Sequence, residues 1–274
     1  MFTRSAFRFD PAAIAGSFVV GVVFVVLLAW MNGSAFGAAT FPLLAMTSGF
    51  ILAGAAYGYL SKGRPGLEPV VTAGLVSGVS YVIITALDLQ AFEGLVNEGT
   101  YTYTMVIAFL NGLVLTVAGA WAGEKLRRTY AGRDATGALE WGWIVAGTIL
   151  GLAVSLFLAN VVIWLFGLSL QPSAALEADH VWAMLFVVVP GLLATGYVCA
   201  FRSPGDTSYE AAVAGLITLI LLIDVFVFTL AGESILTYTR MLLVLVVGLL
   251  ASLLGGYVGE RAQMEAEGPR PSEV

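Results

Sequence analysis

The chain has 274 residues, of which 59% are hydrophobic and only 11% are charged. An ordinary soluble protein carries about 25% charged residues, so this composition excludes a typical soluble domain. The formal net charge of −6 argues against nucleic acid as a partner, because a polyanion is bound by basic surfaces. The sequence therefore predicts an all-α polytopic membrane protein.

Eight long apolar segments follow one another along the chain. A helix of about 20 apolar residues crosses the hydrocarbon core of a bilayer, which is about 30 Å thick. Backbone polar groups find no water there, so each segment must satisfy them internally as a helix. The predicted spans are 11–31, 40–60, 69–91, 101–123, 141–167, 181–201, 211–231 and 236–258.

The distribution of Lys and Arg predicts the orientation in the membrane. With the N-terminus in the cytoplasm, every Lys and Arg except Arg240 falls in a cytoplasmic segment, as the positive-inside rule requires. The six Trp residues fall near predicted span ends on both sides, as aromatic belts do. We therefore expect a multi-pass protein of the cell (inner or plasma) membrane with both termini cytoplasmic.

Two short motifs each occur twice, in the same order. The first, Ser-x-Gly-x4-Glu, lies between the second and third spans of each half, and its residues are Ser61, Gly63 and Glu68, then Ser203, Gly205 and Glu210. The second, Gly-x-aromatic-x-Gly-Glu-basic, ends the fourth span of each half, and its residues are Gly119, Gly123 and Glu124, then Gly255, Gly259 and Glu260. Four spans per unit bring both units into the membrane from the same side. The sequence therefore predicts two parallel four-helix repeats, related by an axis along the membrane normal.

The motifs and the polar segments predict the domain boundaries. A first four-helix repeat occupies 1–125 and a cytoplasmic linker 126–140. A second four-helix repeat occupies 141–261, and a polar, Pro-containing cytoplasmic tail over 262–274 is predicted to be disordered.

Each repeated motif has a structural and a functional interpretation. In the first, Gly permits a turn, and Glu68 or Glu210 complements the positive start of the following helix. Alternatively, these two loops form a contact site for ions, lipid head groups or a partner. In the second motif the glycines are spaced as G-x3-G, which lets two helices approach closely in lipid. We interpret this second motif as helix packing.

Two charges fall inside predicted spans. Asp224 and Arg240 are equidistant from the turn near Gly232, which places them at the same depth, about 12 Å at 1.5 Å per residue. We predict an ion pair between the seventh and eighth spans, with Asn160 at a similar depth. The pair either fixes helix packing or forms a substrate, ion or proton site, because charges in lipid are costly and are functional candidates by default.

Catalytic chemistry is not indicated. The sequence contains no G-x-S-x-G, H-E-x-x-H or Walker motif. Its single Cys excludes an internal disulfide or a thiolate metal cluster, and its single His limits acid–base chemistry. We expect no enzyme activity, no cofactor and no metal site.

The loop from Ser203 to Glu210 resembles loops of small polytopic prokaryotic membrane proteins. The resemblance covers that loop and its looser first-half copy, and it implies no activity. We expect a non-catalytic module, an accessory or scaffold subunit of a membrane assembly, whose partners are the lipid bilayer and either another membrane protein or further copies of itself. The alternative is a small transporter or channel for an ion or small solute that uses the Asp224/Arg240 pair.

Overall fold

The computed structural model describes residues 10–32, 41–61, 66–87, 98–127, 139–166, 180–203, 207–224 and 238–267. Within these ranges the chain is all-helical, which confirms the predicted fold class at that level. The helices are α1 (Pro11–Asn32), α2 (Phe41–Leu60), α3 (Glu68–Ala86), α4 (Glu98–Arg127), α5 (Trp141–Phe166), α6 (His180–Arg202), α7 (Thr207–Asp224) and α8 (Tyr238–Glu267).

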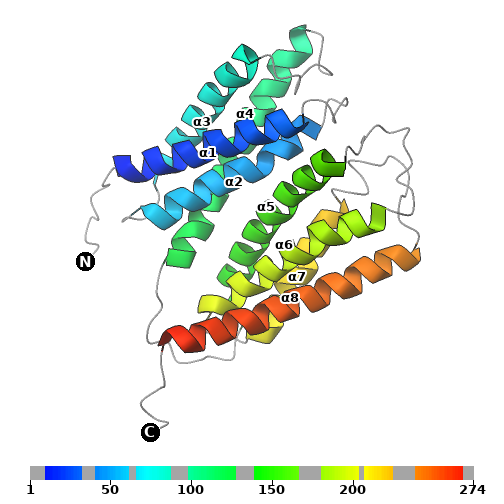
Figure 1. Ribbon diagram of the computed structural model, residues 1–274. Helices are drawn as coiled ribbons and strands as arrows, with labels where there is room; N and C mark the ends of the chain where they lie inside the picture. Colours follow the sequence, from blue (N-terminus) through cyan, green and yellow to red (C-terminus); the bar gives the residue numbers. More distant parts are fainter. Residues whose placement is uncertain are drawn as a thin grey trace, which may run out of the picture.

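The helices form two groups of four that lie side by side. Figure 1 shows α1 to α4 in one group and α5 to α8 in the other. In the first group α2 packs against α1 and α4, and in the second α6 packs against α5 and α8. The start of α1 and the end of α8 lie at the same end of the molecule, called here the basal end (Figure 1).

Four stretches of the described residues are long and apolar enough to cross a membrane. They are Pro11–Met31, Trp141–Val162, Met184–Phe201 and Leu242–Glu265. Large apolar side chains such as Val19 on α1 and Leu250 on α8 are exposed on their outer faces. An outer surface that is apolar requires an apolar solvent, so the fold supports a membrane-embedded protein.

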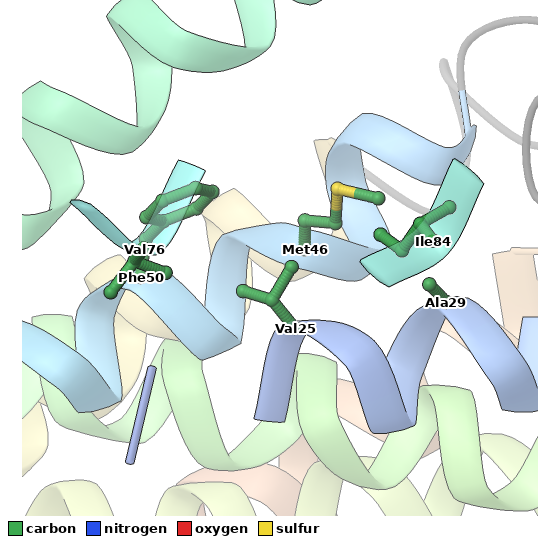
Figure 2. Packing of buried hydrophobic residues seen from close by; sticks show 6 residues of the cluster. All are labelled: Val25, Ala29, Met46, Phe50, Val76 and Ile84. Atoms are coloured by element: carbon green, nitrogen blue, oxygen red, sulfur yellow. The ribbon is translucent and has the colours of Figure 1, made fainter. Parts of the chain in front are cut away.

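The first core lies between α1, α2 and α3. Val25 and Ala29 from α1 and Met46 and Phe50 from α2 pack with Val76 and Ile84 from α3 (Figure 2). All six side chains are buried. Because the helices approach closely at Gly49, where an added Cβ would lie 2.8 Å from a Val25 methyl group, the core has no room for a larger residue there.

The second core lies between α6, α7 and α8. Its buried members are Val188, Leu192, Leu219, Leu222, Val244 and Ala251. Val188 and Leu192 precede the Ser203 motif by the same spacing that separates Met46 and Phe50 from the Ser61 motif. The two cores therefore draw on corresponding positions of their second helices.

Two helices extend beyond the ends of the repeats that the sequence predicts, at 125 and 261. α4 continues to Arg127, into the predicted linker, and α8 continues to Glu267, into the segment predicted to be a disordered tail. α8 thus includes residues 262–267, which the sequence analysis assigns to a tail predicted to be disordered. Strong helix formers occupy this extension, and Arg261 and Glu265 form an i,i+4 ion pair at 3.7 Å that supports the additional turn.

Candidate functional site

The first basal cluster consists of Tyr57 and Ser61 at the end of α2 and Glu68 at the start of α3. All three side chains are buried, with Glu68 only 5% exposed. Tyr57 and Ser61 share a side-chain hydrogen bond. Glu68 Oε2 accepts a hydrogen bond of 2.8 Å from the backbone N–H of Gly66. Asp10, at the start of α1, is close enough to act electrostatically on Tyr57.

The second basal cluster consists of Cys199 in α6, Ser203 just after α6 and Glu210 in α7. These positions correspond to those of Tyr57, Ser61 and Glu68 in the first cluster. Glu210 is 0% exposed. Its Oε1 accepts a hydrogen bond of 2.6 Å from the backbone N–H of Glu140, just before α5. Cys199 Sγ donates to the carbonyl oxygen of Trp143 at 3.3 Å, also at the start of α5. This cluster therefore joins α5, α6 and α7 at the basal end.

Buried carboxylates need strong local compensation, because an ionised group loses its hydration on burial. Both carboxylates have two sources of it. Each lies in the first turn of a helix, where the helix dipole is positive. Each also accepts a backbone N–H, a charge-assisted bond that is stronger than a neutral one. The Glu210 bond joins the start of α7 to the residue before α5, whereas the Glu68 bond stays within the segment that begins α3.

The glycines of the second motif lie where helices meet backbone to backbone. A Cβ added at Gly119 would overlap the carbonyl oxygen of Ile51, and one at Gly123 would overlap that of Ala55. In the other half, a Cβ at Gly255 would overlap the carbonyl oxygen of Leu193. At Gly259 it would lie 2.6 Å from the carbonyl oxygen of Tyr197. The α2/α4 and α6/α8 contacts thus use these glycines for close approach, and Glu124 and Glu260 beside them are partly buried.

The predicted intramembrane site is described only in part. Asp224 is the last residue of α7 and Arg240 lies in the first turn of α8, but their side chains are outside the described residues. Gly63 and Gly205 of the loop motif also lie outside them. Asn160 is described: it is buried in α5, and its Nδ2 donates to the carbonyl oxygen of Leu156 at 2.6 Å.

A junction between the two helix groups is the feature that the sequence analysis missed. Lys125 Nζ, at the end of α4, lies 5.1 Å from the centre of the Trp143 ring in α5 and 5.9 Å from that of Trp121. Gly142 leaves the space for it, since an added Cβ there would overlap Nζ. The only signal in the sequence is the cluster of aromatic residues beside a Lys, which does not specify a contact across the linker.

Among the residues that the structure describes, no three His, Cys, Asp or Glu side chains gather as a metal site would require. Comparisons with protein-family models, with curated proteins and with solved structures find no match to this chain. The candidate site is therefore interpreted from its own geometry alone.

Proposed function

We propose that the chain spans the membrane eight times as two parallel repeats of four helices. The proposal is supported by contacts that recur between corresponding positions. A Cβ at Gly54 would overlap the carbonyl oxygen of Thr116, and a Cβ at Gly196 would overlap that of Ser252. Gly54 precedes Ser61 as Gly196 precedes Ser203, and Thr116 precedes Gly119 as Ser252 precedes Gly255.

The starts of the first and fifth helices support the same proposal. Ile14 N donates to the carbonyl oxygen of Asp10 at 3.1 Å, and Ile144 N donates to that of Glu140 at 3.3 Å. Tyr57 packs with Ile14, and Cys199 packs with Ile144. Aligning Asp10 with Glu140 therefore aligns the neighbours of both basal clusters as well.

The orientation that we propose follows from the basic residues. The N-terminus, the 126–140 linker and the C-terminal segment share one side of a cell membrane, the cytoplasmic side. The start of α1 and the end of α8 at one end of the molecule are compatible with this (Figure 1).

Within that architecture, we propose that the protein is a non-catalytic scaffold or accessory subunit of a membrane assembly. The observation that carries the proposal is where five buried polar side chains donate their hydrogen bonds. Thr116, Thr195 and Thr218 each donate to the carbonyl oxygen four residues earlier in their own helix. Ser252 and Cys199 donate to carbonyl oxygens of neighbouring helices. These groups are used to build and join helices.

Purification from the native membrane tests this function. A tagged chain is extracted in mild detergent and its companions are identified by mass spectrometry. The proposal predicts a stoichiometric membrane partner. Two Trp variants at exposed apolar positions, Val82→Trp on α3 and Val114→Trp on α4, serve as a matched pair. The bulky side chain is tolerated by lipid and displaces a partner, so the variant that loses the partner identifies the contact face.

A contrary result is equally well defined. If the protein purifies without a partner and reconstituted vesicles show a flux of ion or solute that the Asp224→Asn variant abolishes, the scaffold proposal is wrong. The transporter alternative then replaces it.

A further inference from the structure

Asn111 places an amide group on the outer surface of α4. It lies near the middle of the predicted span 101–123, and its side chain is exposed. A carboxamide carries two N–H donors and a carbonyl acceptor, so one hydrogen bond to its own helix satisfies only part of it. The acyl chains of lipid offer neither donors nor acceptors. Something other than lipid must therefore supply hydrogen-bonding groups to Asn111.

Asn160 of α5 shows how this chain accommodates the same group elsewhere. Asn160 is only 2% exposed, and its Nδ2 donates to the carbonyl oxygen of Leu156 at 2.6 Å. Neighbouring helices of the chain thus shield the Asn160 amide from lipid. The Asn111 amide has the opposite setting, because its side chain is open to whatever surrounds the chain.

The course of α5 explains why Asn111 is left open. Ala122 lies on nearly the same side of α4, about three turns nearer the basal end. There α5 covers α4, since Ala122 is 0% exposed and shares a buried cluster with Ala146. Farther from the basal end α5 packs on α1, where the ring centres of Phe24 and Phe157 lie 5.4 Å apart. α5 therefore covers the basal part of this face of α4 and leaves the part that carries Asn111.

The corresponding face of α8 carries a valine in place of the amide. By the alignment of the two Gly-Glu motifs, Asn111 corresponds to Val247 and Val114 to Leu250. Val114 is 64% exposed and Leu250 is 60% exposed, so the two faces are similarly open. Lipid alone suits the face on α8, whereas the face on α4 requires a partner that forms hydrogen bonds, as isolated amides in membrane helices do.

We propose that the face of α4 that carries Asn111 and Val114 binds the same face of a second copy of this chain. A carboxamide is self-complementary, because its N–H group donates to the carbonyl oxygen of another carboxamide and its own oxygen accepts in return. Two copies inserted in the same orientation hold Asn111 at the same depth, and a two-fold axis along the membrane normal brings the two amides together. A second copy thus supplies the required group at the required depth by symmetry.

The neighbours of Asn111 suit a contact between parallel helices. Val114 and Ala118 follow Asn111 at i+3 and i+7, the spacing of residues along the seam of two parallel helices. Ala118 is partly exposed and small, which permits close approach. The inference rests on α4 crossing the membrane, as proposed above, and not on the scaffold role.

Oxidative cross-linking in native membranes tests the contact. Val114→Cys places a thiol on the proposed seam, and a membrane-permeant oxidant joins two thiols that meet there. The expected result is a covalent dimer on a denaturing gel. Leu250→Cys is the matched control at the corresponding place on α8, and its yield of dimer is expected to be roughly tenfold lower. Cys199, the single native cysteine, is buried, so the wild-type chain provides the blank.

Two substitutions of Asn111 test the amide itself. Asn111→Leu keeps the approximate size of the side chain and removes its hydrogen-bonding groups, whereas Asn111→Gln keeps the amide. In the Val114→Cys chain, Asn111→Leu is expected to lower the cross-linked fraction about tenfold, and Asn111→Gln is expected to lower it less. Because the position is exposed, the Leu variant is expected to fold, and thermal unfolding in mild detergent checks this.

Four outcomes would overturn the proposal. One is the absence of a Val114→Cys dimer while its thiol reacts with a membrane-permeant monofunctional reagent. The second is an equal yield from Val114→Cys and Leu250→Cys, which indicates random collision. The third is a folded Asn111→Leu variant that cross-links as strongly as its parent. The fourth is a monomeric chain from which Asn111→Leu releases a different membrane protein. In each case the sidedness of the segments between spans decides the membrane architecture separately.

Discussion

The two basal clusters occupy corresponding places in the molecule but hold their carboxylates differently. Glu68 accepts a hydrogen bond from Gly66, two residues away, whereas Glu210 accepts one from Glu140, 70 residues away. The neighbouring side chain is a Tyr in one cluster and a Cys in the other. The two clusters therefore share a buried carboxyl group in the first turn of a helix, whereas the backbone N–H that donates to it comes from a different part of the chain in each.

The largest losses of stability are expected at the helix crossings, which are equivalent in the two halves. Replacing Gly54 or Gly196 by Leu places a side chain into a backbone carbonyl of α4 or α8. We expect each variant to lose about 3 kcal/mol or more of stability, the upper end of overpacking costs, because backbone cannot move aside without separating the helices. The measurement is thermal unfolding in mild detergent, followed by size-exclusion chromatography.

Gly78 in α3 supplies the matched control for these crossings. It is exposed, and nothing lies within 4 Å of an added Cβ. Gly78→Leu is expected to unfold at the wild-type temperature or slightly above it, because Leu favours a helix over Gly by up to about 1 kcal/mol. Equal losses at Gly54 and Gly78 would show that the crossings are not close contacts.

The predicted Asp224/Arg240 pair distinguishes the second half of the chain from the first, since the first half carries Thr104 where the second carries Arg240. Asp224→Ala is expected to destabilise the chain by about 3 kcal/mol, because Arg240 is then unpaired in lipid. The swap Asp224→Arg/Arg240→Asp is expected to recover most of this. A swap as unstable as the single variant would mean that the two charges do not pair.

The two basal carboxylates are expected to contribute different amounts to the stability of the protein. Glu210→Ala leaves the Glu140 N–H without its acceptor and disconnects α7 from α5, so we expect a loss of about 1–3 kcal/mol. Glu68→Ala removes a local bond and is expected to cost less. Chemical unfolding of both variants in one detergent ranks them, and a larger loss for Glu68→Ala would reverse the interpretation of the two clusters.

The smallest losses of stability are expected for substitutions of Lys125 and Arg261, and the loss at Lys125 is expected to be the larger of the two. Lys125→Ala removes a cation from two Trp rings, which is worth about 0.5–2 kcal/mol depending on burial. Arg261→Ala in detergent-isolated monomers removes only an exposed i,i+4 pair, worth about 0.5 kcal/mol at most. Tryptophan fluorescence during unfolding follows the first variant directly.

Much of the fold is predictable because membrane helices are long and uniform. The predicted span 141–167 agrees with α5 at Trp141–Phe166, and Glu68 and Glu210 occupy first helical turns as expected. Helix ends are less predictable, since apolar composition does not indicate where a helix stops in water. The helical extension to Glu267 depends on ordinary helix propensity and an ion pair instead.

The contacts of the candidate site are less predictable than its residues. The repeated motifs identified Ser61, Glu68, Ser203 and Glu210, all of which are buried. The bond between Glu210 and Glu140 does not follow from the motif, because it depends on how α5 and α7 pack. The position of Lys125 over Trp143 is likewise a result of the packing between the two helix groups.

The central claim, two parallel four-span units, is tested most directly by the sidedness of the connecting segments. Single Cys variants at Asp134 in the linker, Ser272 in the tail, and Glu93 and Glu233 between predicted spans are labelled with a membrane-impermeant thiol reagent. Intact cells and inverted vesicles are compared. Labelling of Asp134→Cys and Ser272→Cys only in inverted vesicles, and of Glu93→Cys and Glu233→Cys only in intact cells, is the predicted result. Asp134→Cys and Ser272→Cys on opposite sides would contradict the claim.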